Sequence, residues 1–179
     1  MYKINNNQLE MIITDNSAAL DRLRRGFAKN KSWIEAIVSY IDIHGDTDIN
    51  DLTAGLSSLL EVNEDVASVY IEIAMSKLKV LGKLKAVNNT ISIGDGKLHM
   101  SERSMEDIMF AVSGIKGCGP LSEAYYVNII ASVNTGRNVD PSIHIYDIDR
   151  QIAKAVLKEL LRKNILHRHG KFIYAEDTA

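Results

Sequence analysis

The sequence predicts a mainly α-helical fold with small β-hairpins, arranged as two similar units behind an N-terminal helical extension. Apolar residues recur every three or four positions over most of the 179 residues, which is the spacing of helices that bury one face. Pro120 and Pro141 are the only prolines, and proline breaks helices. Two pairs of short runs with strand composition each follow a group of three predicted helices.

Composition excludes two broad classes of protein. The chain has 21 Lys and Arg against 23 Asp and Glu, and 46% of its residues are hydrophobic. This apolar content is too high, and the net charge of -2 too low, for an intrinsically disordered chain. The charge balance also excludes a uniformly basic nucleic-acid binder, so any contact with nucleic acid must come from a local patch.

The single cysteine, Cys118, excludes an internal disulfide and favours a reducing compartment, the cytoplasm with its nucleoid or a nucleus. We expect no signal peptide, because residues 1–7 are polar and no apolar segment follows. Charged residues interrupt every apolar stretch within a few positions, so we expect no membrane contact.

The extension covers residues 1–31. Asp15 or Asn16 is expected to cap its helix, and Gly26 to end it. Its last turn and the following linker carry a group of cations, which is either ordinary surface charge or an auxiliary phosphate contact: Arg22, Arg24, Arg25, Lys29 and Lys31.

The first unit covers residues 32–97. Ser32 lies three residues before Glu35, the spacing of a capping box, and therefore predicts a helix start. Helices are expected over Ser32–His44, Asp51–Leu60 and Asn63–Leu81, followed by a hairpin over Lys83–Ile93. Asn88-Asn89 suits its tight turn, because Asn tolerates positive φ. The third helix is expected to bury Val66, Val69, Tyr70, Ile73, Leu78 and Leu81.

The second unit covers residues 102–179 and repeats this order. Ser104 is expected to cap its first helix and Asp147 its third. Between them the sequence predicts a helix over Leu121–Val133, a loop, and a short strand at Ile143–Ile145. A final hairpin over Ile165–Ala175 turns at His169-Gly170.

Three helices closed by a β-hairpin resemble the winged-helix variant of the helix-turn-helix superfamily, here in two tandem copies. The resemblance implies tandem winged-helix domains. Many members of the superfamily bind DNA, with the third helix in the major groove and the hairpin, or wing, on the backbone. Others are protein-interaction modules, including tandem winged-helix subunits of chromosome-condensing and membrane-sorting complexes.

The third helix of the second unit carries a basic stripe. Arg150, Lys154, Lys158 and Arg162 are spaced by four, with Gln151 beside them, and so share one helix face. The following hairpin adds Arg168 and Lys171 where a wing would meet the DNA backbone. These residues are the predicted contacts to double-stranded DNA. The alternative is a solvent-exposed face whose positive charge is partly neutralised by Asp147, Asp149 and Glu159.

The third helix of the first unit differs, because acidic residues on its outer face would be repelled by phosphates. Ile71 and Met75 lie one turn apart and, together with Glu72, predict a contact with a protein partner or a second copy in a homodimer. The alternative is that this helix is buried on more than one side.

No catalytic residue, metal site or cofactor is predicted, and an enzyme is not expected. His167 and His169, with Cys118 or His144, do not complete a ligand set of known spacing. Gly94-Asp95-Gly96-Lys97 lacks the length of a phosphate-binding loop and is expected to link the units.

The expected function is DNA binding in transcription or replication control, with the second unit contacting DNA and the first mediating association. The alternative is a protein-interaction adaptor that binds no nucleic acid.

Overall fold

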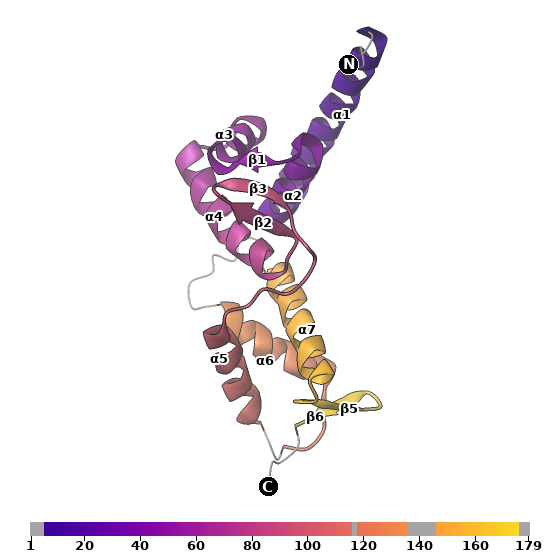
Figure 1. Cartoon of the computed structure of the whole chain (residues 1–179), viewed down its shortest axis with the longest axis vertical. Coiled ribbons are helices and arrows are strands. Elements are labelled where there is room, and N and C mark those ends of the chain that lie inside the picture. The colour runs from indigo at the N-terminus through magenta and orange to yellow at the C-terminus, as the bar shows by residue number, and fades with distance from the viewer. Residues whose placement is uncertain (1–5, 116–117, 136–145, 176–179) are drawn as a thin grey trace.

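The computed structural model describes residues 6–115, 118–135 and 146–175, and the side chains of residues 16–115, 118–133 and 148–175. In these residues the chain is mainly helical with two small antiparallel sheets, which confirms the predicted mainly helical class with small hairpins (Figure 1).

The N-terminal extension is one long helix, α1 (Asn6–Asn30), whose first turns project beyond the other elements (Figure 1). It begins at Asn6 and continues past Gly26, so both the predicted cap at Asp15 or Asn16 and the predicted end at Gly26 are wrong. The reason is tertiary packing, since the C-terminal half of α1 lies along the following helix. Leu23 is buried there, and the ring of Phe27 meets Trp33 edge-on with centroids 5.0 Å apart.

The first unit begins with α2 (Trp33–His44), a short strand β1 (Thr47–Asp48) and α3 (Ile49–Leu60). Then come α4 (Glu64–Val80), β2 (Leu84–Val87) and β3 (Thr90–Ile93). The side chains of Ser32, Asp48 and Asn63 each accept a hydrogen bond from a backbone N–H in the first turn of α2, α3 and α4. The cap at Ser32 is the predicted one, and Asn63 lies at the predicted start of its helix.

The hairpin of the first unit turns at Asn88 and Asn89, which adopt φ of 51° and 67°. This confirms the two-residue turn that their tolerance of positive φ predicts. The sheet order is β1-β3-β2, so β3 is central and β2 forms one edge. The pairing of β1 with β3, Thr47 opposite Ile91, was not expected.

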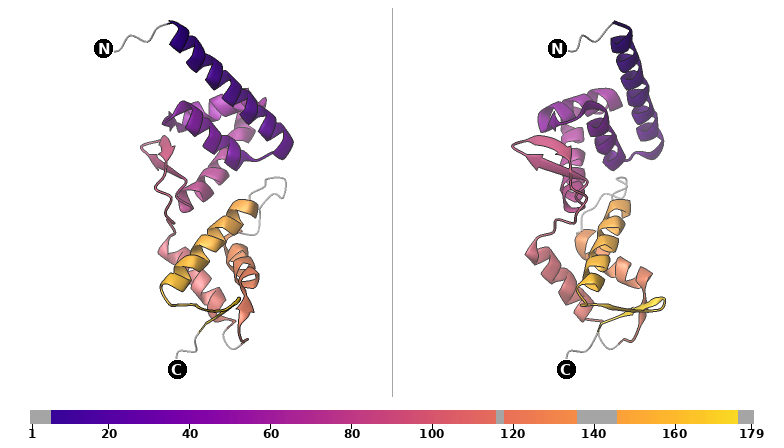
Figure 2. Two further views of the ribbon diagram at one scale, coloured as in Figure 1. Left: turned by 90° about the vertical axis from the view of Figure 1, so that its right-hand side faces the viewer. Right: turned by 45° about the vertical axis from the view of Figure 1, so that its right-hand side comes forward.

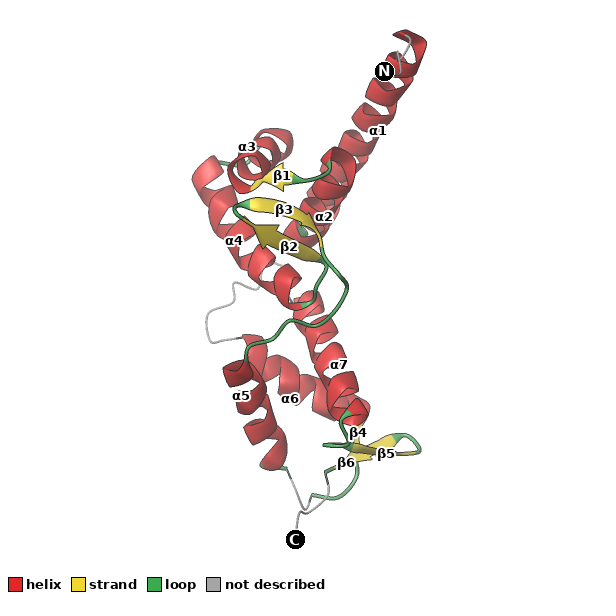
Figure 3. Ribbon diagram, viewed as in Figure 1, coloured by secondary structure: helices red, strands yellow, loops and turns green. Residues whose placement is uncertain are grey.

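The second unit has the same order: α5 (Glu102–Ser113), β4 (Leu121–Ser122), α6 (Glu123–Thr135), α7 (Tyr146–Arg162), β5 (His167–His169) and β6 (Phe172–Tyr174). Its sheet order, β4-β6-β5, also matches (Figure 3). Ser101 caps α5 in place of Ser104, and α7 already begins at Tyr146. The strand predicted at residues 143–145 lies outside the described residues.

The buried face of α4 agrees with the predicted one at Leu78, and Tyr70, Ile73 and Leu81 are partly buried against the core, but it differs elsewhere. Val66 and Val69 are 44% and 56% exposed, whereas Ile71 and Met75 are 1% and 4% exposed. The prediction of an exposed apolar patch at Ile71 and Met75 is therefore wrong. The physical reason is that α4 packs against α2, α3 and β2 and also contacts α7, so the buried face turns toward these neighbours.

A buried ion pair joins the two units. Lys77 Nζ of α4 lies 2.9 Å from Asp149 Oδ1 in the first turn of α7. Asp149 is 1% exposed and is the one fully buried charged residue in the described part of the chain. The contact between α4 and α7 brings the N-terminal end of α7 against the first unit (Figure 2).

The segment between the units, residues 94–99, is held against the first unit by backbone hydrogen bonds and is called the strap below. Gly94 N donates to Lys83 O at 2.9 Å, Gly96 N to Gly82 O at 2.8 Å, and His99 N to Val80 O at 2.7 Å. Gly82 has φ of 73°, and a Cβ there would lie 2.1 Å from the carbonyl oxygen of Lys97. Only glycine allows the strap to approach this closely.

Candidate nucleic-acid interface

The outer face of α7 carries the predicted basic stripe. Its inner face is closed by Ile148, Ile152, Val156 and Leu160, each at most 2% exposed. Because these apolar residues recur at helical spacing, the polar residues between them are turned outward. Five of the predicted DNA contacts are exposed on this face: Arg150, Gln151, Lys154, Lys158 and Arg162. Arg168 and Lys171, at the hairpin that follows α7, are exposed as well.

Two of these cations already have carboxylate partners. Arg162 Nε donates to Glu159 Oε2 at 3.0 Å, and hydrogen bonding from Arg162 is the main cause that lowers the pKa of Glu159. Arg168 donates from two nitrogens to Glu123 Oε2 at 3.1 and 3.2 Å and thereby ties β5 to α6. Their charge is partly neutralised, so they are weaker candidates for phosphate contact than the rest.

Arg150, Lys154, Lys158 and Lys171 make no ion pair with any residue that the structure describes. The expectation that Asp149 partly neutralises the positive charge of the stripe is wrong, because this side chain is buried against Lys77. The side chain of Asp147 lies outside those described. Three cations without a partner among the described carboxylates, at intervals of four, therefore remain along the exposed face of α7, which is a surface suited to phosphate oxygens.

The exposed face of α4 has the opposite charge. Glu64, Asp65 and Glu72 are exposed there, beside the half-exposed Val66 and Val69. Carboxylates in this arrangement would be repelled by a phosphate backbone. Of the residues predicted for a protein contact on this helix, only Glu72 lies on the surface.

A second basic surface was missed by the sequence interpretation. Lys79, Lys83, Lys85 and Lys97, called the lysine cluster below, are exposed around the base of the β2–β3 hairpin. None of their ammonium groups makes an ion pair with a described carboxylate. The neighbouring Asp95 binds His99 Nε2 at 2.8 Å and accepts a hydrogen bond from the backbone N–H of Lys97 at 2.9 Å. The sequence does contain a pattern that indicates this cluster, because Asp95 is the only acidic residue between Lys77 and His99.

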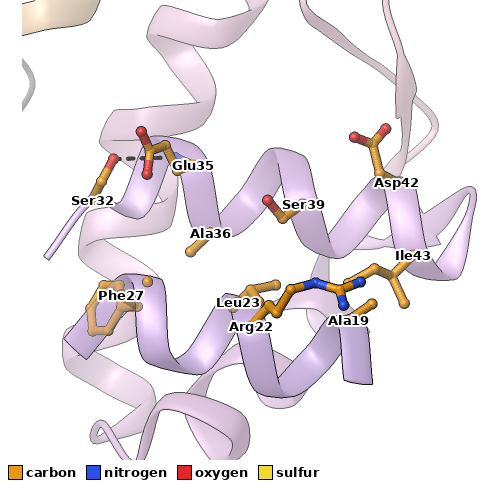
Figure 4. A pocket seen from close by; sticks show the side chains of 11 residues that line it. Ala19, Arg22, Leu23, Phe27, Ser32, Glu35, Ala36, Ser39, Asp42 and Ile43 are labelled. Carbon is orange, nitrogen blue, oxygen red and sulfur yellow. Dashed lines mark hydrogen bonds between the residues drawn. The ribbon is translucent and has the colours of Figure 1, made fainter. Parts of the chain in front are cut away.

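The cations of the extension are a mixed case. Arg24 and Arg25 both pair with Asp21, at 2.8 Å each. Arg22 lies in a groove of about 340 Å³ between α1 and α2, which Glu35 and Asp42 of α2 also line (Figure 4). This groove holds both signs of charge and offers no preference for an anion.

In the described part of the chain, no three His, Cys, Asp or Glu residues lie close enough to hold a metal ion. His144, one of the ligands considered, lies outside that part. None of the helices in the described ranges is both long enough and apolar enough to cross a bilayer.

Arg150, Lys154 and Lys158 on α7 are thus the strongest candidate contacts, with the lysine cluster as a separate basic surface. No protein-family model, no curated protein and no solved structure matches this chain.

Proposed function

We propose that the protein is a tandem winged-helix protein that binds double-stranded DNA in transcription or replication control. The observation that carries the proposal is the row of three exposed cations on α7, none paired with a described carboxylate: Arg150, Lys154 and Lys158.

The arrangement of elements supports the winged-helix assignment. Both units run helix, strand, helix, helix and hairpin, and both sheets place the last strand of the hairpin at the centre. In such a domain the third helix enters the major groove and the hairpin lies on the backbone. For the second unit these elements are α7 and β5–β6, which together carry the exposed cations.

The binding would be governed by salt. Four phosphate contacts, from Arg150, Lys154, Lys158 and Lys171, correspond to a slope of log K against log salt of about -3 to -4. The chain's net charge of -2 adds no general attraction, so the affinity would come from this face alone.

The test is fluorescence anisotropy of a labelled 20-base-pair duplex, titrated with protein at several salt concentrations. The variant Lys154→Glu with Lys158→Glu should abolish binding. The control, Arg103→Glu, reverses the charge of an exposed residue on α5, outside both α7 and the extension, and should bind as the unaltered protein does. Absence of binding by the unaltered protein at low salt would remove the proposal.

A protein-interaction adaptor is the second candidate. Phe110 of α5 is 83% exposed and Met109 beside it 39%, and together they offer an apolar contact for a partner. Absence of DNA binding at low salt would leave this function in its place.

A further inference from the structure

We propose that the free edge of β2, with the groove beside it and the lysine cluster, docks an extended acidic segment of a partner protein. This inference does not rest on DNA binding, because it uses other residues and another unit.

The edge of β2 offers unpaired backbone groups. Among the residues that the structure describes, the order β1-β3-β2 gives β2 a neighbouring strand on one side only. The two-residue turn makes Val87 and Thr90 a hydrogen-bonded pair, as are Lys85 and Ser92 two residues further along. The N–H and C=O groups of Leu84 and Ala86 therefore point away from β3, and a further strand could pair with them.

A groove of about 430 Å³ adjoins this edge. Leu84, Ala86 and Ile93 line its strand side, and Ile93 is 51% exposed. Lys79 at the end of α4 and His99 of the strap form other parts of its wall. Lys85 and Asp95 line the groove as well, and Asp95 pairs with His99 at 2.8 Å. The groove thus has an apolar floor large enough for one or two aliphatic side chains, and a rim that carries the ammonium groups of Lys79 and Lys85 beside one paired carboxylate.

The lysine side chains determine that the docked segment should carry negative charge. Lys83 and Lys85 are two residues apart, so their side chains lie on the face of β2 opposite that of Leu84 and Ala86. A strand added at this edge would place alternate side chains on the two faces. Apolar side chains would enter the groove and acidic ones would face the lysines, so the fitting sequence alternates apolar with Asp or Glu.

A peptide segment fits these features better than a duplex does. Phosphates could contact the lysines, but a duplex fills no apolar groove and forms no ladder with Leu84 and Ala86.

The experiment uses the full chain and a fluorescein-labelled peptide of four Val-Glu repeats, with anisotropy as the readout. We expect saturable binding to the unaltered protein. A peptide of four Val-Lys repeats reverses the charge, and one of four Pro-Glu repeats removes every second backbone donor. Both should bind at least about tenfold more weakly, since a few lost hydrogen bonds or ion pairs have that effect.

Two variants locate the site. Ala86→Pro removes an outward N–H without changing charge, at an edge position where proline is tolerated. Lys83→Glu with Lys85→Glu reverses the charge and leaves the edge intact. Each should weaken peptide binding about tenfold or more. Lys154→Glu with Lys158→Glu should leave peptide binding unchanged while abolishing DNA binding. The peptide-docking and DNA-binding proposals can therefore be tested independently of each other.

Three results would overturn the inference. The first is absence of saturable binding of the Val-Glu peptide. The second is a loss of duplex binding, in place of peptide binding, on reversing Lys83 and Lys85, which would make the cluster a nucleic-acid surface. The third is a dimer in sedimentation that Ala86→Pro dissociates, which would identify a second copy as the occupant.

Discussion

Replacing Lys77 by methionine should destabilise the protein by about 3–5 kcal/mol, because it leaves the carboxylate of Asp149 buried without its cation. The side chain of Asp149 is 2% exposed and that of Lys77 18%, with 2.9 Å between Nζ and Oδ1. At an effective dielectric constant of about 20, the direct attraction at this distance is about 6 kcal/mol. Most of it offsets the cost of removing both groups from water.

The other changes at this pair should have smaller effects. Asp149→Asn keeps the shape and leaves the cation on Lys77, which still reaches solvent, so we expect a loss of about 1–2 kcal/mol. Lys77→Met with Asp149→Leu removes both charges and should unfold within about 1 kcal/mol of the unaltered protein.

The assay is urea unfolding followed by two probes. Trp33, the only tryptophan, reports on the first unit through its fluorescence, and circular dichroism reports on the helices of both units. Because the pair joins α4 to α7, we expect the two transitions to separate in Lys77→Met. A loss below about 1 kcal/mol in Lys77→Met, with coincident transitions, would refute the reasoning.

Three further predictions concern single sites. Ile71→Glu should lower the free energy of unfolding in urea by more than about 4 kcal/mol, because it buries a charge. Val69→Glu, on the exposed face of α4, should lower it by less than about 1 kcal/mol. Equal losses would contradict the assignment of Ile71 to the buried face of α4. Gly82→Ala should lower stability by about 2–3 kcal/mol, because it combines positive φ with a clash against the strap, and an unchanged melting temperature would speak against that contact. The pKa of Glu159 should lie below its ordinary value of 4.5, so the stabilisation from its pair with Arg162 is present above that pH and is lost as pH falls through the lower value. A carboxyl carbon titration by NMR should show the midpoint rising toward 4.5 in Arg162→Gln, and no rise would exclude this pair as the cause.

Features set by neighbouring residues were predictable from the sequence. The turn at Asn88-Asn89 and the cap at Ser32 depend on a few adjacent backbone groups, and both are confirmed. The stripe on α7 was equally accessible, because its cations and the apolar residues between them follow one helical period.

Features set by distant residues were not predictable. Apolar residues lie nearly all around α4, so periodicity does not distinguish Val69 from Ile71, and only the neighbouring helices and strand decide which is buried. The ion pair that partly neutralises Arg168 depends on Glu123, 45 residues earlier. The inward direction of Asp149 depends on Lys77 in the other unit, a partner that no local pattern indicates.

The strap also fixes how far the two units can move apart. Its last backbone hydrogen bond is donated by His99, and Ser101 already caps α5, so a single residue separates the anchored chain from the next helix. A connection this short keeps the start of α5 close to the C-terminal end of α4. Inserting a few glycines after Met100 would make the connection between the two units flexible. The units would then no longer be held in the alignment that the Lys77–Asp149 pair requires.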